Sequence, residues 1–252
     1  MTVVELEVKG DIGIVTLDRP EKLNAINAEM LDELHEAVEA ITRSGGIGAA
    51  VLTGRGRAFS AGGDINAMEG MGDREFTDTV SRYMRVSSAF RACPKPFVAA
   101  IHGYALAGGL ELALMCDVRF AATGTKFGLP DTPLGLSPTS GMTYLLPRVV
   151  GFGRAMYLAL HAENIDAEEA ERIGLGSRVL EPEALLPEAE ALAHRIASYP
   201  RVGVAWTKLG FHRASEVDFE AATRSEEEGE LASFRSPDTR ERFRAFVHRR
   251  RS

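Results

Sequence analysis

Two acidic side chains stand in surroundings where a carboxyl group can donate or accept a proton. Glu111 lies within the apolar run from Leu110 to Met115, which leaves it little exposed face if that run is helical. Asp131 lies in a turn-rich loop between Pro130 and Pro133. Burial raises the pKa of a carboxyl group, as acid–base catalysis requires. Either acid can also be structural, Glu111 as a helix cap and Asp131 in an Asx turn, so both interpretations stay open.

Two glycine-bearing segments directly follow buried strands, and they can supply main-chain N–H groups to a ligand. The first runs from Arg57 to Ile65 and the second from His102 to Met115. Small residues let a ligand approach the backbone closely, although the first segment alone is equally typical of a tight turn. In the second, a helix is expected to begin near Ala107. Its first N–H groups have no partner within the helix, and Glu111 lies one turn beyond Gly108 on the same face.

The elements that must position these segments follow from hydrophobic periodicity. Alternating apolar residues between positions 4 and 17 predict a β-hairpin, and the spacing after Asn27 predicts a helix with that residue as N-cap. Short apolar runs at 49–53 and 96–101 predict buried strands. Strands that alternate with helices favour βαβ units around a largely parallel sheet. Beyond about residue 140 the pattern is mostly helical, with segments expected at 167–173, 183–198, 202–212 and 219–234 and one short strand at 177–180.

Composition limits the class of protein. The chain has 252 residues and a net charge of −7, which argues against nucleic acid as the main partner. Only two cysteines occur, Cys93 and Cys116, and both are expected to be buried free thiols. The N-terminus does not read as a signal peptide, and no apolar run approaches the length of a membrane span. These features predict a cytoplasmic protein.

Taken together, the glycine-bearing segments and the Asp131 loop resemble the crotonase superfamily, the enoyl-CoA hydratase/isomerase family. The stretch from Arg19 to Asn27 looks like that family's N-terminal signature. The similarity continues in the right order to the end of the chain, through the segments 147–151, 167–170, 174–175 and 245–247. Because it spans nearly the whole chain, it is specific even though no single motif is decisive.

The resemblance implies a fold and an assembly. The fold is an α/β, crotonase-like spiral of repeated ββα/βαβ units with a helical C-terminal trimerisation region. The core with the coenzyme A site and the active site would occupy residues 1–195, and the helical oligomerisation or lid region residues 196–252. The chain would form a homotrimer or a dimer of trimers. It would take an acyl-CoA thioester as substrate, with no separate cofactor, no metal, no nucleic acid and no membrane as partner.

The resemblance also implies roles for residues. The backbone N–H groups of Gly63 and Gly108 would form an oxyanion hole for the thioester oxygen. Glu111 would orient water for attack at C3 of a trans-2-enoyl-CoA, and Asp131 would deliver a proton to C2. The second acid is usually glutamate in hydratases, so Asp131 has a reach shorter by about 1–1.5 Å. The residues expected to hold coenzyme A and substrate are Lys22, Ala25, Ala61, Gly63, Asp64, Ile65, Asn66, Gly108 and Arg249.

Several alternatives remain beside hydration. An enoyl-CoA isomerase of the Δ3,Δ2 type, which needs only one acid, is the second choice after hydration. The same oxyanion hole can also serve other acyl-CoA reactions. A serine hydrolase would need Ser60 and His102 to meet, yet no G-x-S-x-G elbow is present. A non-catalytic or RNA-binding oligomer of the same fold would not need the two acids. The acyl pocket is expected to be apolar and lined in part by Met68, Met71, Tyr83, Met84, Met142 and Tyr144.

Overall fold

The computed structural model describes residues 2–249, except that it does not describe the side chain of residue 249. Its main sheet has six strands in the order β1-β2-β3-β4-β6-β9. These strands are β1 (Val4–Lys9), β2 (Ile12–Leu17), β3 (Ala49–Gly54), β4 (Phe97–Ile101), β6 (Val118–Ala122) and β9 (Arg178–Leu180). β1 and β2 form an antiparallel hairpin, and every later pairing in this sheet is parallel. β3 and β4 are buried along their whole length, which explains their continuous apolar sequence.

A second, smaller sheet lies beside the carboxyl ends of β3 and β4. It consists of β5 (Tyr104–Leu106), β7 (Lys126–Gly128) and β8 (Ile165–Asp166). An isolated bridge between Ser60 and Ala105 joins the loop after β3 to β5. The two glycine-bearing segments are therefore held side by side, although 36 residues separate them in the sequence.

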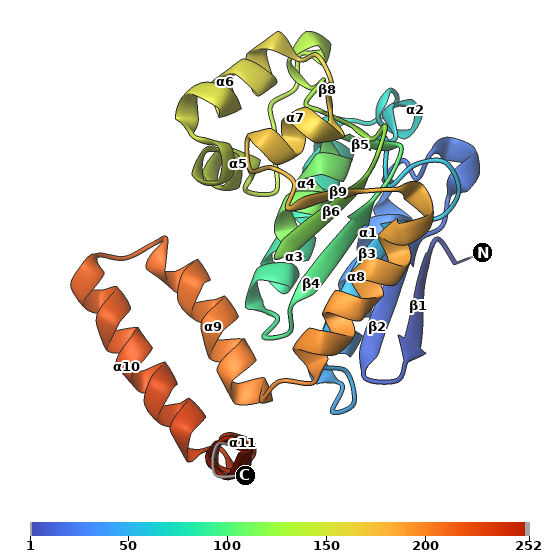
Figure 1. Cartoon of the computed structure of the whole chain (residues 1–252). Coiled ribbons are helices and arrows are strands. Elements are labelled where there is room, and N and C mark those ends of the chain that lie inside the picture. The colour runs from blue at the N-terminus through green and yellow to red at the C-terminus, as the bar shows by residue number, and fades with distance from the viewer. Residues whose placement is uncertain (1, 250–252) are drawn as a thin grey trace.

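Helices cover both faces of the main sheet (Figure 1). α1 (Ala28–Arg43) and α3 (Asp73–Ala92) pack against each other, and the side chain of Asn27 caps α1 by accepting from Met30 N. They join α4 (Gly108–Met115) in the larger hydrophobic cluster. α8 (Pro182–Ala197) covers the opposite face and buries Leu185, Ala189 and Ala193 against the strands.

Shorter elements complete the upper part of the molecule in Figure 1. They are α2 (Ile65–Met68), α5 (Met142–Val150), α6 (Phe152–His161), α7 (Ala167–Arg172) and the 3-10 helices η1 (Pro20–Lys22) and η2 (Thr132–Leu134). No helix within residues 2–249 is long and apolar enough to cross a membrane.

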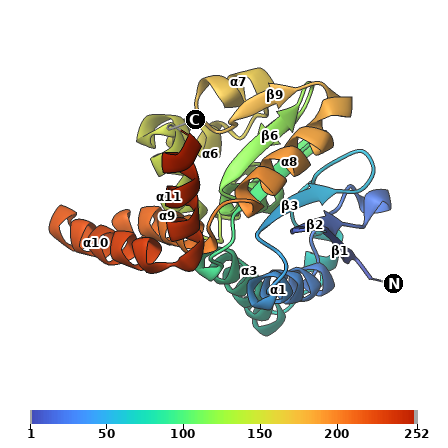
Figure 2. The same ribbon diagram turned by 60° about the horizontal axis from the view of Figure 1, so that its bottom comes forward.

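The C-terminal helices form an arm that extends from the sheet (Figures 1 and 2). α9 (Arg201–Ala214) packs along α10 (Phe219–Arg235), and α11 (Pro237–Arg249) follows. Gly229 permits this packing, because a Cβ atom there would lie 2.8 Å from the Trp206 ring. Lys208 anchors the arm to the core through an ion pair of 3.0 Å with Asp117 at the start of β6.

Most predicted elements are confirmed, including the hairpin, the Asn27 cap and the helices after residue 166. Cys93 and Cys116 are buried free thiols, as expected. The long helix α3 and the small sheet were not predicted. The proposed division at residue 195 stays a prediction, although the nearest break between helices lies slightly later, between α8 and α9.

Candidate active site

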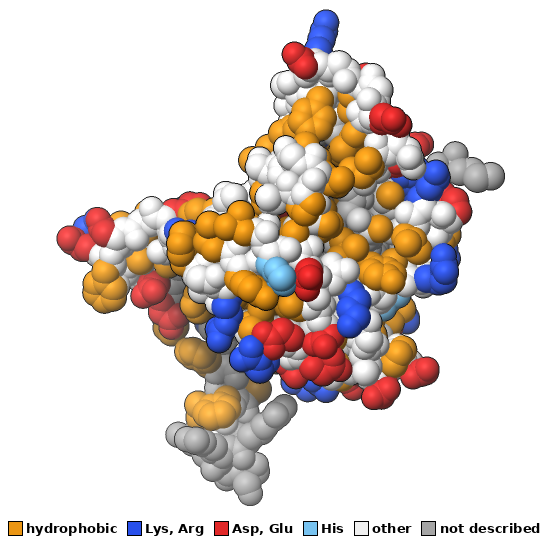
Figure 3. Space-filling view, turned by 90° about the horizontal axis from the view of Figure 1, so that it is seen from above, with side chains coloured by type: hydrophobic (Ala, Val, Ile, Leu, Met, Phe, Trp, Pro, Cys, Tyr) orange, Lys and Arg blue, Asp and Glu red, His pale blue; other side chains and the backbone are white. Residues whose placement is uncertain are grey.

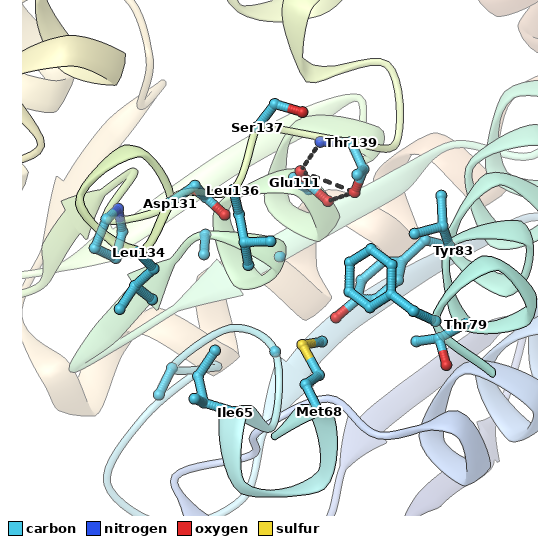
Figure 4. Close-up of a pocket in the computed structure, with 17 residues that line it drawn as sticks. Ile65, Met68, Thr79, Tyr83, Glu111, Asp131, Leu134, Leu136, Ser137 and Thr139 are labelled. Atoms are coloured by element: carbon cyan, nitrogen blue, oxygen red, sulfur yellow. Dashed lines mark hydrogen bonds between the residues drawn. The ribbon is translucent and has the colours of Figure 1, made fainter. Parts of the chain in front are cut away.

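A pocket opens where the two glycine-bearing segments meet helix α3 and the loop around η2 (Figure 4). Its wall is mostly apolar, with two carboxyl groups and a few hydroxyl groups facing into it. The lining residues are Ala61, Gly63, Ile65, Met68, Phe76, Thr79, Val80, Tyr83, Ala107, Gly108, Glu111, Pro130, Asp131, Leu134, Leu136, Ser137 and Thr139. All four residues predicted to carry the chemistry therefore line one pocket.

The main-chain amides of Gly63 and Gly108 are available to a ligand. Neither N–H group has an acceptor among residues 2–249, whereas the amides of Asp64 and Ala107 do. Asp64 N donates to Ile26 O at 2.9 Å, and Ala107 N donates to Gly128 O at 2.9 Å. Gly108 is the first residue of α4, so its N–H group lies at the positive end of the helix dipole. The two free amides are the donors that an oxyanion hole requires.

The start of α4 is held in place by close packing. A Cβ atom on Gly109 would lie 2.5 Å from the carbonyl oxygen of Ser60, so this glycine brings the helix against the loop after β3. Ala107, directly before the helix, has a φ of 44°, which is strained for an L-residue. The neighbouring segments therefore fix the direction of the first amides of α4.

Glu111 is buried, with 4% of its surface exposed, and both of its carboxylate oxygens are held by one residue. Thr139 N donates to Oε1 at 2.6 Å, and the Thr139 hydroxyl lies 3.0 Å from Oε2 and 3.3 Å from Oε1. Burial raises the pKa of Glu111, and the charge of Asp131 raises it further. The hydrogen bonds from Thr139 oppose this shift because they favour the ionised form.

Asp131 stands at the start of η2 and is half-buried. Its Oδ2 atom is buried and has no hydrogen-bond partner within the described part of the chain. Burial raises the pKa of this carboxyl group, with some opposition from a backbone hydrogen bond. In Figure 4 the carboxyl group points towards the interior of the pocket, on the side where Glu111 lies. An unpartnered buried acid of this kind is free to exchange a proton with a bound molecule.

The residues predicted to bind coenzyme A are only partly gathered at the pocket. Lys22 and Asn66 are exposed, and with Ala25 they do not line the pocket. Asp64 is engaged within the protein: its carboxylate pairs with Arg19 at 3.0 Å and caps α2 through Ala67 N. Arg249 ends α11, and its side chain lies outside the described residues.

Of the six residues expected in the pocket wall, Met68 and Tyr83 line it and four do not. Met84 is largely exposed on α3, and Met142 is buried in the core. The Tyr144 hydroxyl donates to Ser215 O at 2.7 Å, away from the pocket, and Met71 contacts Thr79 instead.

The sequence analysis named Tyr83 but missed the rest of the α3 face and Thr139. Phe76, Thr79, Val80 and Tyr83 recur at helical spacing, and that signal could have shown one wall of the pocket. No comparable signal marks Thr139, because it meets Glu111 across 28 positions of sequence.

The arrangement does not support the hydrolase alternative. The Ser60 hydroxyl donates to Asn24 O at 2.8 Å, and the His102 ring lies 3.2 Å from Gly56 O. Each side chain is thus used separately, and they do not form a nucleophile–base pair. No group of three or more metal-ligating side chains occurs within residues 2–249.

Comparisons with known proteins identify the family. The model of the family described as enoyl-CoA hydratase/isomerase matches residues 7–252. The chain is 39% identical over 249 residues to a probable enoyl-CoA hydratase of Rhizobium meliloti, covering 98% of this chain and 95% of the relative. It is 36% identical to a short-chain-enoyl-CoA hydratase of Clostridium acetobutylicum, with the same coverage.

Solved structures give the same result. An enoyl-CoA hydratase from Bacillus anthracis superposes with a TM-score of 0.95 at 30% identity, covering 98% of this chain and 96% of that one. DspI from Pseudomonas aeruginosa also superposes with a TM-score of 0.95, at 32% identity, covering 99% of this chain and 95% of that one. These matches confirm the resemblance and the fold class that the sequence predicted. The chain therefore belongs to the enoyl-CoA hydratase/isomerase family.

Proposed function

We propose that this enzyme adds water across the 2,3 double bond of a trans-2-enoyl-CoA thioester. The names of the relatives support this reaction, since several are called enoyl-CoA or crotonyl-CoA hydratase. The observation that carries the proposal is local. Buried Glu111 and half-buried Asp131, both with a raised pKa, share a pocket with two main-chain amides that have no acceptor among the described residues.

The amides stabilise the charge that hydration creates. When the oxygen of water bonds to C3, the electron pair of the double bond moves through C2 to the thioester oxygen and forms an enolate. Gly63 and Gly108 donate to that oxygen. Removing one such donor from a comparable site costs about 3–4 kcal/mol of transition-state stabilisation.

The two acids divide the proton transfers. Glu111 orients the water and accepts one of its protons as the C3–O bond forms. Asp131, in its protonated form, gives a proton to C2 and collapses the enolate to the 3-hydroxyacyl thioester. The sum is the addition of one water molecule. A proton passing from Glu111 to Asp131, directly or through water, restores both groups.

Isomerisation between a 3-enoyl and a 2-enoyl thioester is the second candidate, and one observation favours it. Both oxygens of Glu111 are engaged by Thr139, whereas Asp131 Oδ2 has no partner within residues 2–249. A single free acid suffices to move a proton between C2 and C4. A non-catalytic or RNA-binding role would predict instead that replacing both acids leaves function intact.

The binding of coenzyme A and the assembly belong to the same proposal. The 61–66 loop would hold the adenine and pantetheine, with Lys22 and Arg249 near the phosphates. The copies would form a homotrimer or a dimer of trimers in the cytoplasm. Large apolar side chains exposed on the C-terminal helices support self-association, among them Phe211, Phe219, Phe234, Phe243 and Phe246. Hydrophobic side chains also gather in patches on the face seen in Figure 3.

The test is to incubate the enzyme separately with crotonyl-CoA and a 3-enoyl-CoA while following the absorbance of the conjugated thioester. Loss of absorbance with crotonyl-CoA supports hydration. A gain with the 3-enoyl substrate and no loss with crotonyl-CoA would replace hydration by isomerisation. No change in either would contradict both reactions.

A further inference from the structure

The hydroxyl group of Tyr83 has no assigned partner in the mechanism above. Tyr83 lies on α3, is 5% exposed and lines the pocket. Its oxygen makes no hydrogen bond to any other described residue, and Figure 4 shows it pointing into the pocket. Buried tyrosine hydroxyl groups usually have a hydrogen-bond partner, because an unmade hydrogen bond costs free energy. The Tyr83 oxygen is reached from the pocket, so a molecule in the pocket, either water or a ligand, is its available partner.

The position of this oxygen relative to the two glycines is specific. A Cβ atom built on Gly108 would lie 3.0 Å from the Tyr83 oxygen, and one built on Gly63 would lie 3.5 Å from it. The hydroxyl group therefore sits beside both glycines whose amides have no acceptor among the described residues. An apolar ring at this position would pack equally well, so the location of the oxygen itself needs an explanation.

We propose that the Tyr83 hydroxyl donates a third hydrogen bond to the thioester oxygen, beside the amides of Gly63 and Gly108. This assignment rests on the proposed function, because it requires an acyl-CoA thioester in the pocket. The bond strengthens as the oxygen becomes an enolate, since a hydrogen bond to a charged acceptor is about twice as strong as a neutral one. Tyr83 is then a catalytic residue that acts without transferring a proton.

The surroundings keep this group in the donor form. Burial raises the pKa of Tyr83, and the negative charges of Glu111 and Asp131 raise it further. Burial, with a smaller contribution from the two acids, therefore favours the protonated phenol, which can donate a hydrogen bond.

The test compares Tyr83→Phe, which removes only the oxygen, with Tyr104→Phe as a matched control. Tyr104 is 40% exposed on the neighbouring strand β5 and does not line the pocket. Two quantities are measured. One is kcat and KM with crotonyl-CoA. The other is the red shift of bound 4-(dimethylamino)cinnamoyl-CoA, a chromophore whose absorption reports polarisation of the thioester carbonyl.

Tyr83→Phe is expected to lower kcat about 10- to 100-fold, less than the loss of a principal oxyanion donor, with little change in KM. It should also reduce the red shift, while Tyr104→Phe changes neither quantity. A wild-type red shift and kcat in Tyr83→Phe would overturn the proposal and leave Tyr83 as a packing residue. If the wild type does not hydrate crotonyl-CoA but Tyr83→Phe still reduces the shift, the proposed function fails and the Tyr83 assignment stands. Absence of any shift in the wild type would overturn both.

Discussion

Substituting Gly63 by alanine gives a sharp test of the pocket geometry, because one atom is added at a known place. A Cβ atom on Gly63 would lie 2.7 Å from Met68 Cε. Carbon atoms in contact are normally separated by about 3.5–4.0 Å, so the methionine tip or the loop must move by about 1 Å. Gly63 does not have a positive φ, so alanine fits the backbone conformation.

A displacement of that size at a catalytic site can cost about a hundredfold in rate. Because the clash involves the end of a flexible side chain, part of it relaxes. We therefore expect kcat/KM with crotonyl-CoA to fall about 10- to 100-fold, which corresponds to about 1.4–2.7 kcal/mol. The melting temperature should change little, since no buried backbone is displaced.

The double variant Gly63→Ala/Met68→Leu separates the steric cause from other effects. Leucine ends one atom earlier than methionine, so the double variant should recover most of the lost activity. Gly70→Ala is the control, because a Cβ atom there meets nothing within 4 Å. Wild-type kinetics in Gly63→Ala, or a double variant no better than the single one, would refute the placement of residue 63 against Met68 at the reacting centre.

Three further substitutions test the site and its support. Glu111→Gln should lower kcat about 10²- to 10⁴-fold. The melting temperature of this variant at pH 7 should be equal to or higher than that of the wild type. The pKa of Glu111 is raised in the folded state, so its contribution to stability is present at low pH and is lost as the pH rises through the folded-state pKa. A loss of both activity and folding would contradict this. Thr139→Val removes the hydroxyl group but keeps the hydrogen bond from the main-chain N–H group to Glu111. Because the lost hydrogen bond favours the ionised carboxylate, the acidic limb of the kcat/KM–pH profile should move to higher pH by about 0.5–1 unit. An unmoved limb would show that the hydroxyl group does not control the ionisation of Glu111. Lys208→Met removes the lysine that pairs with Asp117 at the base of the C-terminal arm, while Phe97 N at 2.8 Å and His212 Nε2 at 3.5 Å still contact that carboxylate. It should therefore cost about 1.5–3 kcal/mol in chemical denaturation, with a smaller cost when Asp117→Asn is added; equal costs in the two variants would contradict a direct ion pair.

Local signals in the sequence were enough to predict much of the fold. The Asn27 cap, the apolar strands β3 and β4 and the glycines at the start of α4 depend on neighbouring residues, so each could be recognised in one stretch of sequence. α3 was missed although it has twenty residues. Its exposed face is rich in charged side chains, and Arg82 and Arg85 both reach Asp32 of α1 instead of solvent alone.

The site was predictable in its residue types but not in its contacts. Glu111 and Asp131 could be singled out because acids are rare in apolar surroundings. The difference in hydrogen bonding between the two carboxyl groups could not be predicted. Thr139 holds Glu111 from another loop, and whether Asp131 Oδ2 has a partner within the described residues depends on contacts distant in sequence. Asp64 was named as a coenzyme A contact because of the family resemblance, and that contact stays a prediction. The sequence did not show that its carboxylate pairs with Arg19.

The central claim is that one oxygen of the substrate is bound by the amides of Gly63 and Gly108 together. The most direct measurement is a crystal structure with butyryl-CoA, a saturated thioester that cannot be hydrated. The claim predicts a thioester oxygen within about 3.1 Å of both nitrogen atoms, with the acyl chain running between Glu111 and Asp131. A thioester oxygen that contacts neither amide, or a ligand bound outside this pocket, would contradict it.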